Sequence, residues 1–205
     1  MTNFQKRILT SIIILPLSIF FIAKGNNFLS FFSIFILFVG LHELFTSFKR
    51  IITRLSLSCV LFLFIFSINF LNQESEYLLY LTIAVSVGSD IGGYVFGKVF
   101  KWKKLTKISP KKTISGVFGS YFCSLIIAAI FHEVVIDINQ LTIIPKELLA
   151  ILFSTIAQVG DLIISYFKRL EKIKDTGKIL PGHGGIFDRI DGLMFVVTVT
   201  YFFLI

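Results

Sequence analysis

Apolar residues in this chain occur in long continuous runs that short polar stretches separate. Several runs approach the ~20 residues that a helix needs to cross ~30 Å of hydrocarbon, although the first and third are shorter. The runs do not alternate between apolar and polar positions, so we predict helices and exclude strands as the spanning elements. Seven apolar segments can be distinguished, at residues 8–23, 28–47, 55–71, 77–99, 114–136, 147–167 and 189–205.

The composition indicates an integral membrane protein. Hydrophobic residues make up 55% of the 205 positions, 25 residues are Phe, and the mean hydropathy is +0.86. These values are well above those of a soluble domain. Because no internal repeat or low-complexity linker divides the chain, we predict one all-α domain over residues 1–205, a polytopic membrane helical bundle of about seven transmembrane helices.

Positive charge is distributed unequally between the two sides that alternating helices define. If the N-terminus is cytoplasmic, all but two of the 20 Lys and Arg residues fall on the cytoplasmic side, the exceptions being Lys24 and Lys146. Such a bias sets the orientation of most membrane proteins. We therefore predict a cytoplasmic N-terminus and a basic cytoplasmic face, which suits nucleotides and anionic headgroups better than nucleic acid. No cleavage site follows the first apolar run, so we do not expect it to be a signal peptide.

Charged residues and glycines gather between the sixth and seventh apolar segments, from Ser165 to Asp191. Just before this stretch, Asp161 lies inside the sixth segment, where a carboxylate is costly and by default indicates function. Ser165 is four residues further on and shares a helix face with it, and Lys168 and Arg169 continue near that face. The alternative is an Asp that packs between helices and pairs with a neighbouring cation.

Asp188, Arg189 and Asp191 open the seventh segment and follow a glycine-rich turn. Taken alone, carboxylates at a helix start are ordinary caps. Glycines such as Gly184 and Gly185, however, let backbone N–H groups approach phosphate oxygens at a helix N-terminus. Asp188 could then hold a metal that bridges those phosphates.

His183 stands between two glycines in the same turn. A phosphate contact and an ordinary hydrogen-bonded loop role are about equally supported for it. Near the end of the second segment, His42 and Glu43 are more easily explained by pairing with a helix end than by chemistry.

A second cluster joins the fourth and fifth segments. Asp90 is a buried acid in a predicted spanning helix, and Lys111, Lys112 and Thr113 supply cations and a hydroxyl at the start of the next helix. This arrangement is typical of a phosphate site. The alternative for the basic residues of this loop is a positive-inside anchor.

These two clusters resemble the signature of the CDP-diacylglycerol synthases, or phosphatidate cytidylyltransferases. The late stretch reads Ser-x-x-Lys-Arg-x4-Lys-Asp-x-Gly-x3-Pro-Gly-His-Gly-Gly-x2-Asp-Arg-x-Asp, and the earlier one reads Asp-x-x-Gly-Tyr-x-x-Gly followed by Ser-Pro-Lys-Lys-Thr. The resemblance covers most of the chain. The chain departs from the family at Ser115, where Glu or Gln is usual, and it is shorter by one or two early helices.

The resemblance implies transfer of CMP from CTP to phosphatidate, giving CDP-diacylglycerol and pyrophosphate. It implies Mg²⁺ on Asp161 and Asp188, with room for a monovalent cation such as K⁺, and it implies a homodimer with a polar cavity open to the cytoplasm. Ser165 and Lys168 would line the catalytic centre. Substrate contacts are implied for Asp90, Lys111, Lys112, Thr113, Arg169, Lys174, Asp175, His183, Gly184, Gly185, Arg189 and Asp191.

The expected chemistry needs no protein nucleophile, because the phosphate of phosphatidate can attack the α-phosphorus of CTP directly. Catalysis then consists of alignment and charge neutralisation. The general base, if there is one, is not decided by the residues. Two other classes stay open: a transporter or channel with Asp90, Asp161 and Glu43 along an ion path, and a lipid kinase that uses CTP as phosphate donor.

Overall fold

The computed structural model is all-helical in the residues that it describes, which are 3–134, 144–177, 179–180 and 184–204. The predicted all-α bundle is confirmed, and each apolar segment corresponds to one helix. The helices are α1 (Asn3–Lys24), α2 (Asn26–Ser47), α3 (Ile51–Glu74), α4 (Glu76–Phe100), α5 (Ile114–Val134), α6 (Lys146–Leu170) and α7 (Phe187–Leu204).

Five of these helices, α2 to α6, are long and apolar enough to cross a membrane by length and composition. The helices extend a few residues beyond most of the predicted apolar runs, because helical hydrogen bonding continues into polar residues at the membrane surface. The difference matters most for α7, which begins at Phe187 and therefore has Asp188 in its first turn. The apolar pattern had placed this start at residue 189.

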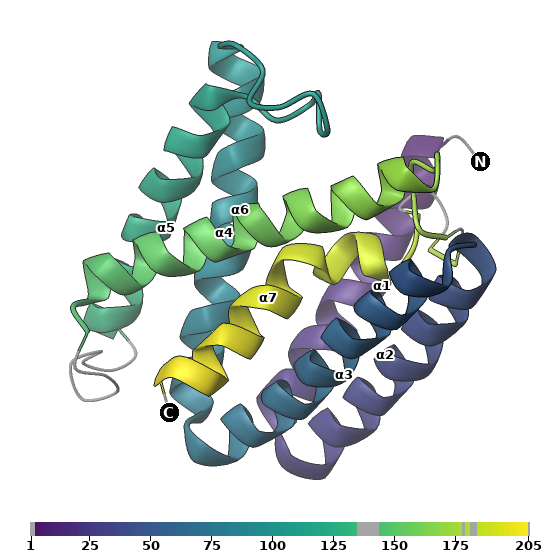
Figure 1. The fold of residues 1–205 in the computed structure, drawn as a ribbon. Coiled ribbons are helices and arrows are strands. Elements are labelled where there is room, and N and C mark those ends of the chain that lie inside the picture. The colour runs from purple at the N-terminus through teal and green to yellow at the C-terminus, as the bar shows by residue number, and fades with distance from the viewer. Residues whose placement is uncertain (1–2, 135–143, 178, 181–183, 205) are drawn as a thin grey trace.

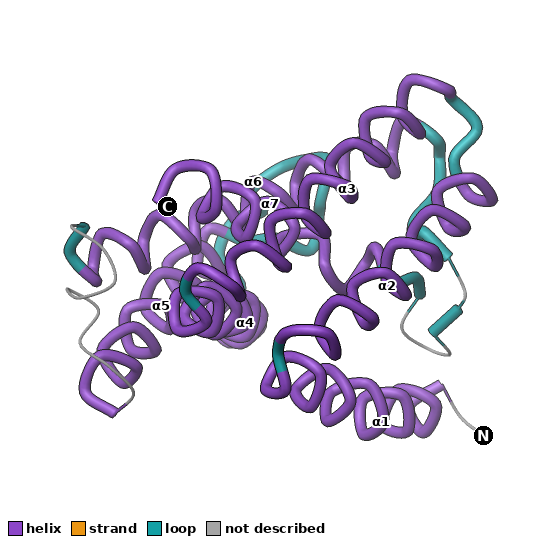
Figure 2. Tube along the Cα trace, turned by 90° about the horizontal axis from the view of Figure 1, so that it is seen from below, coloured by secondary structure: helices purple, strands orange, loops and turns teal. Residues whose placement is uncertain are grey.

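The helices form two groups that α6 and α7 join. Figure 1 shows α1, α2 and α3 together on one side, and the steep pair α4 and α5 on the other. Helix α6 contacts α4, α5 and α7, while α7 also contacts α3. The tube in Figure 2, turned by 90°, shows the same separation of α4 and α5 from α1 and α2. Helix α7 therefore contacts both groups, through α3 and α4, and α6 packs on α7 and on the α4–α5 pair.

Close backbone contact holds α4 against α5. A Cβ atom built on Gly92 would lie 2.2 Å from the backbone oxygen of Gly119, and one built on Gly119 would lie 2.4 Å from Cβ of Phe96. No real Cβ tolerates such distances, so only glycine allows the two helices to approach this closely. This contact fixes the helix pair that carries the basic loop 101–113.

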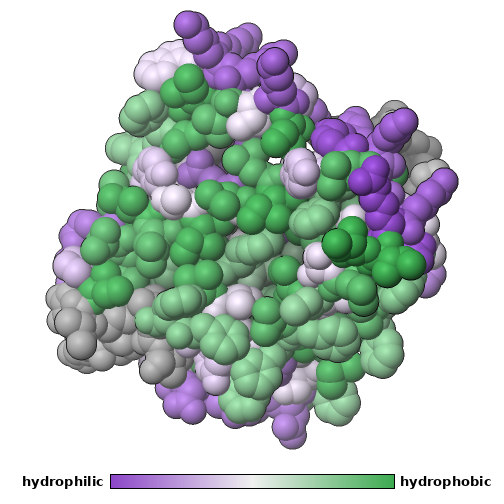
Figure 3. All heavy atoms as spheres, viewed as in Figure 1, coloured by the Kyte–Doolittle hydropathy of each residue, from purple (hydrophilic) through white to green (hydrophobic). Residues whose placement is uncertain are grey.

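The surface is that expected of a protein in lipid. Figure 3 shows a broad apolar band across the molecule, with hydrophilic residues collected mainly at the upper and right-hand ends. Large apolar side chains point outward, including Phe31 (70% exposed), Phe38 (69%) and Phe203 (79%). Exposure on this scale indicates a membrane interface. The cytoplasmic orientation of the basic end stays a prediction.

The end of α6 is tied to the turn between α2 and α3. Glu171 follows α6, and its carboxylate accepts hydrogen bonds from the backbone N–H groups of Lys49 at 3.2 Å and Arg50 at 3.0 Å. Desolvation raises the pKa of Glu171, but these hydrogen bonds outweigh it and the pKa lies below its usual value. The contact places the start of the loop that follows α6 beside the turn between α2 and α3.

Candidate functional site

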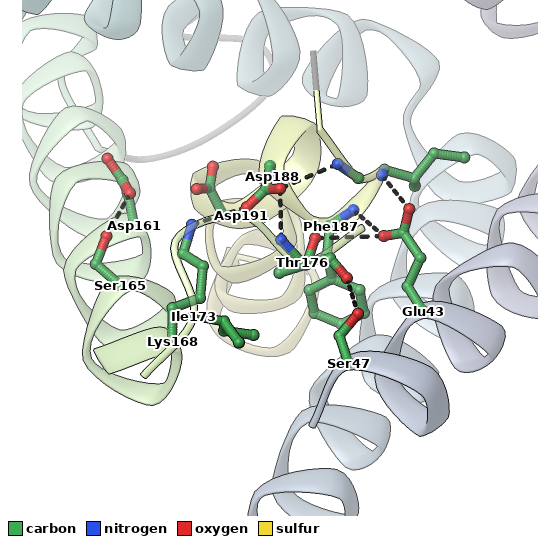
Figure 4. Close-up of polar contacts among 12 residues, drawn as sticks. Glu43, Ser47, Asp161, Ser165, Lys168, Ile173, Thr176, Phe187, Asp188 and Asp191 are labelled. Carbon is green, nitrogen blue, oxygen red and sulfur yellow. Dashed lines mark hydrogen bonds and ion pairs between the residues drawn. The ribbon is translucent and has the colours of Figure 1, made fainter. Parts of the chain in front are cut away.

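Helix α6 presents an acid and a hydroxyl on one face, as their spacing predicts. The Ser165 hydroxyl donates a hydrogen bond to Oδ1 of Asp161 at 3.3 Å. Lys168 continues this row, and its residue is 8% exposed. Figure 4 shows Asp161 and Ser165 beside each other on α6 and the Lys168 side chain reaching toward Asp188 on α7.

The basic loop 101–113 reaches this row through Lys112. The Lys112 ammonium lies 2.6 Å from Oδ2 of Asp161 and donates a second hydrogen bond to the Gln158 carbonyl at 3.1 Å. Both side chains are partly accessible, at 22% and 29%. This ion pair brings the two sequence clusters together, and it satisfies the cation partner that the packing interpretation of Asp161 also requires.

Asp188, in the first turn of α7, forms a second and more deeply buried ion pair. Its Oδ1 lies 2.8 Å from the Lys168 ammonium, and the two side chains are 10% and 7% exposed for lysine and aspartate. Its Oδ2 accepts hydrogen bonds from the backbone N–H groups of Thr176 at 2.8 Å and Gly185 at 3.0 Å. Both carboxylate oxygens of Asp188 are therefore bound within the site (Figure 4).

Two further predicted acids lie near Asp161. Asp90 on α4 is exposed by its accessible surface rather than buried as the sequence predicted, because it lies at the accessible edge of the helix, and it interacts electrostatically with Asp161, Lys112 and Arg189. Asp191 on α7 interacts with Asp161 and accepts a hydrogen bond from the adjacent Gly192 N–H at 3.0 Å. The fold thus gathers acids from three helices around the two lysine pairs.

The basic and hydroxyl residues of the earlier cluster take different positions. Thr113 caps α5, because its hydroxyl accepts from the Gly116 N–H at 3.1 Å and also bonds to Ser115 at 3.0 Å. Ser115, which departs from the family pattern, is 2% exposed beneath this cap. Lys111 is exposed at the surface, unlike its neighbour Lys112. Thr113 therefore has a structural role that its sequence context did not suggest.

The other predicted residues line loop 171–186 and its neighbours. Lys174, Asp175 and Arg189 are exposed. Arg169 is exposed as well, and its Nε donates to the Ile108 carbonyl at 3.3 Å, which ties α6 to the basic loop.

The part of the glycine-rich turn that can be described lies against Asp175 and Asp188. Gly184 has a φ of 91°, and a Cβ there would lie 2.8 Å from Oδ2 of Asp188 and 3.3 Å from Cβ of Asp175. Glycine is required at position 184 because of the positive φ and because a Cβ atom would have no room. His183 lies outside the described residues.

Glu43 is a buried acid that sequence reasoning left out of the site. It is 1% exposed at the end of α2. Its Oε1 accepts from the Ile186 N–H at 2.8 Å, and its Oε2 accepts from the Phe187 N–H at 3.1 Å and from the Thr176 hydroxyl at 3.3 Å. The expected pairing with a helix end is confirmed, but the helix is the distant α7. Its position inside an apolar run was the signal that could have placed it near the site.

The donor set fits Mg²⁺ only if a substrate completes the coordination. Among the described residues no group of three or more His, Cys, Asp or Glu is arranged to hold a metal ion. Mg²⁺ prefers oxygen ligands and is commonly held by one or two carboxylates together with phosphate and water oxygens. Asp161 and Asp188 supply such oxygens, and each is now paired with a lysine. The residues fit a metal shared with a nucleotide rather than an all-protein cage.

A helical membrane protein with lysine–carboxylate pairs and amide groups at a helix start belongs to the class that can bind phosphates at the membrane surface. Residues 46–205 match the model of the cytidylyltransferase family, and the chain belongs to that family.

Individual relatives carry a common name. The chain is 42% identical over 144 residues to the phosphatidate cytidylyltransferase of Staphylococcus aureus (strain COL), which covers 69% of this chain and 54% of that protein. It is 40% identical over 139 residues to the protein of the same name from Staphylococcus epidermidis (strain ATCC 12228 / FDA PCI 1200), covering 66% and 53%. The match to the Staphylococcus haemolyticus (strain JCSC1435) protein is 44% over 131 residues, covering 63% and 49%. The chain spans about half the length of the curated relatives it matches.

Proposed function

We propose that this protein transfers CMP from CTP to phosphatidate, forming CDP-diacylglycerol and pyrophosphate. The observation that carries the proposal is that the two sequence clusters meet in one site. Lys112 of the earlier cluster pairs with Asp161, and Lys168 pairs with Asp188 within the later cluster. Family membership and the names of the staphylococcal relatives support the same reaction. Residues of both clusters are expected to contact phosphates.

In the proposed reaction, a phosphate oxygen of phosphatidate attacks the α-phosphorus of CTP. A new P–O bond forms while the bond from the α-phosphorus to the bridging oxygen breaks, and pyrophosphate leaves with that electron pair. Lys112 and Lys168 would move from their carboxylates to phosphate oxygens and neutralise the charge that collects there. No covalent intermediate on the protein is needed.

Asp161 and Asp188 would hold Mg²⁺, which supplies Lewis-acid neutralisation of the phosphate oxygens when bound. Releasing the lysines to the substrate would free the same carboxylate oxygens for the metal ion. A monovalent cation such as K⁺ beside Mg²⁺ is part of the proposal, and Asp191, which interacts with Asp161, is an additional acid that could help to hold it.

We also propose that the protein acts in a bacterial inner membrane as a homodimer, with the site facing the cytoplasm. The unequal distribution of Lys and Arg between the two sides of the predicted helices supports this orientation. CTP is a cytoplasmic nucleotide, so a site at that end has direct access to it.

The test is incubation of the purified protein with labelled CTP, phosphatidate and Mg²⁺, followed by separation of lipids and nucleotides. We expect label from the cytosine and the α-phosphorus in the lipid, together with free pyrophosphate. Label from the γ-phosphorus in the lipid with release of CDP would show a lipid kinase instead. No labelled lipid, combined with ion flux in proteoliposomes, would favour a transporter.

A further inference from the structure

One buried acid from outside the two clusters contacts the segment that holds Asp188. The carboxylate of Glu43 accepts hydrogen bonds only from neutral donors in its described contacts: two backbone N–H groups at the start of α7 and the Thr176 hydroxyl. The N-terminus of α7 carries partial positive charge, which stabilises an anion at this place. These donors and the helix N-terminus therefore stabilise the buried carboxylate of Glu43 without a cation partner among its described contacts.

Glycines of loop 171–186 close around this carboxylate. A Cβ on Gly185 would lie 2.4 Å from Oε2 of Glu43, and one on Gly177 would lie 2.7 Å from its Oε1. Both distances are shorter than real Cβ contacts allow. The loop backbone therefore encloses the carboxylate, and a shift of the Glu43 head would displace the loop.

Thr176 connects Glu43 to Asp188 directly. Its hydroxyl donates to Glu43, its backbone N–H donates to Oδ2 of Asp188, and its carbonyl accepts from the Ser47 hydroxyl. The backbone N–H that donates to Asp188 thus belongs to Thr176, which is also hydrogen-bonded to Glu43 and Ser47 of α2. Figure 4 shows this chain of contacts running from Glu43 and Ser47 to Asp188.

Glu43 also occupies donors that Asp188 could otherwise use. An aspartate in the first turn of a helix can bend back to cap free N–H groups of that turn. Because Glu43 already accepts from the N–H groups of Ile186 and Phe187, the Asp188 carboxylate stays turned toward Lys168 and the Thr176 and Gly185 amides.

We propose that Glu43 is a positioning residue: it locks loop 171–186 onto α2 and thereby sets the direction of the Asp188 carboxylate. Its consequence for turnover rests on the proposed function, whereas its consequence for the loop does not. Glu43 contacts neither phosphate nor cation in this role and acts only through Thr176 and the start of α7.

The primary variant is Glu43→Gln, because glutamine keeps the shape but turns one oxygen into a donor that faces other donors. We expect turnover to fall by about 10-fold to 10²-fold with the KM for CTP changed less than about threefold. The Mg²⁺ concentration for half-maximal rate should rise several-fold. Hydrogen exchange of the peptides covering 176–187 should become faster, and Mg²⁺ titration by calorimetry in the presence of CTP should show weaker Mg²⁺ binding.

Matched variants keep the test decisive if Glu43→Gln does not fold. Thr176→Val removes only the hydroxyl that Glu43 accepts from and should reproduce the faster exchange and the Mg²⁺ effect in weaker form. Thr176→Ser keeps the hydroxyl and should restore near-normal values. His42→Gln, at the exposed neighbouring position on α2, should leave both measurements unchanged.

The outcomes separate this proposal from the proposed function. If the unmodified protein forms no CDP-lipid, the proposed function fails, while hydrogen exchange still decides the role of Glu43. Unchanged exchange and unchanged Mg²⁺ titration in both Glu43→Gln and Thr176→Val would overturn the proposal. A lowered Tm with normal turnover and a normal Mg²⁺ requirement would overturn it as well, because a purely structural role has that result.

Discussion

The substitution Asp188→Asn tests the core of the site, because it removes one charge and keeps the side chain's shape. In the protein as it stands, Oδ1 of Asp188 pairs with Lys168 at 2.8 Å, and Oδ2 accepts two backbone N–H groups. Asparagine has only one acceptor oxygen. Whichever way its amide turns, its NH₂ group faces either the lysine ammonium or the two backbone donors.

The size of the effect follows from how deeply the pair is buried. Removing one partner of a buried, hydrogen-bonded charge pair costs ~2–5 kcal/mol, much of it from the charge left behind. The side chains of Lys168 and Asp188 are only 10% and 7% exposed, but asparagine keeps one acceptor, so about 3 kcal/mol is a suitable central value. That cost falls on the stability of the folded protein. The loss of turnover follows from the charge that the carboxylate supplies to the site, and removing one such preorganised electrostatic group costs at least ~10²-fold, or about 2.7 kcal/mol.

The assay is initial-rate CMP transfer from labelled CTP to phosphatidate in detergent micelles, with the Mg²⁺ concentration varied. Glu74→Gln removes a charge from an exposed position at the opposite end of the bundle and serves as the matched control. The double variant Lys168→Met with Asp188→Asn removes both charges of the pair. If these residues bind substrate and cation, the double variant stays as inactive as the single ones.

Two results would refute this reasoning. Near-normal turnover and Mg²⁺ dependence in Asp188→Asn would show that the carboxylate is not part of the catalytic charge arrangement. Recovery of activity in the double variant would show that the pair only compensates two buried charges, since neutralising both would then repair the site.

Three further predictions concern topology, packing and the metal. In a background lacking Cys59 and Cys123, Gln73→Cys should react with an impermeant thiol reagent from outside the cell and Lys107→Cys only after permeabilisation; the reverse pattern would refute the assigned orientation. Gly119→Leu should lower the free energy of unfolding by about 1–3 kcal/mol, because α4 and α5 must separate to admit the side chain. The Tm of this variant in detergent should be lower than that of the control Phe118→Leu, which changes an exposed position. Chelation should abolish transfer activity and added Mg²⁺ should restore it, and activity that persists in excess chelator would exclude the proposed metal role.

The amino-acid sequence by itself determined the class of the fold. Hydropathy depends on consecutive residues, so seven helices and their approximate bounds could be predicted without knowing any contact. The bounds were less precise than the number of helices: α1, α3 and α7 begin before their apolar runs, because helices continue into polar residues. The row formed by Asp161, Ser165 and Lys168 was equally local, since helical spacing alone places these side chains on one face.

Only the tertiary structure decided which groups meet. The sequence did not assign a lysine to either acid, and the fold pairs Lys112 with Asp161 and Lys168 with Asp188. The role of Glu43 was beyond sequence reasoning, because its partner Ile186 lies 143 residues further along the chain. Such contacts depend on how α2, α6 and α7 pack together, and packing is a property of three-dimensional arrangement that no local pattern of residues records.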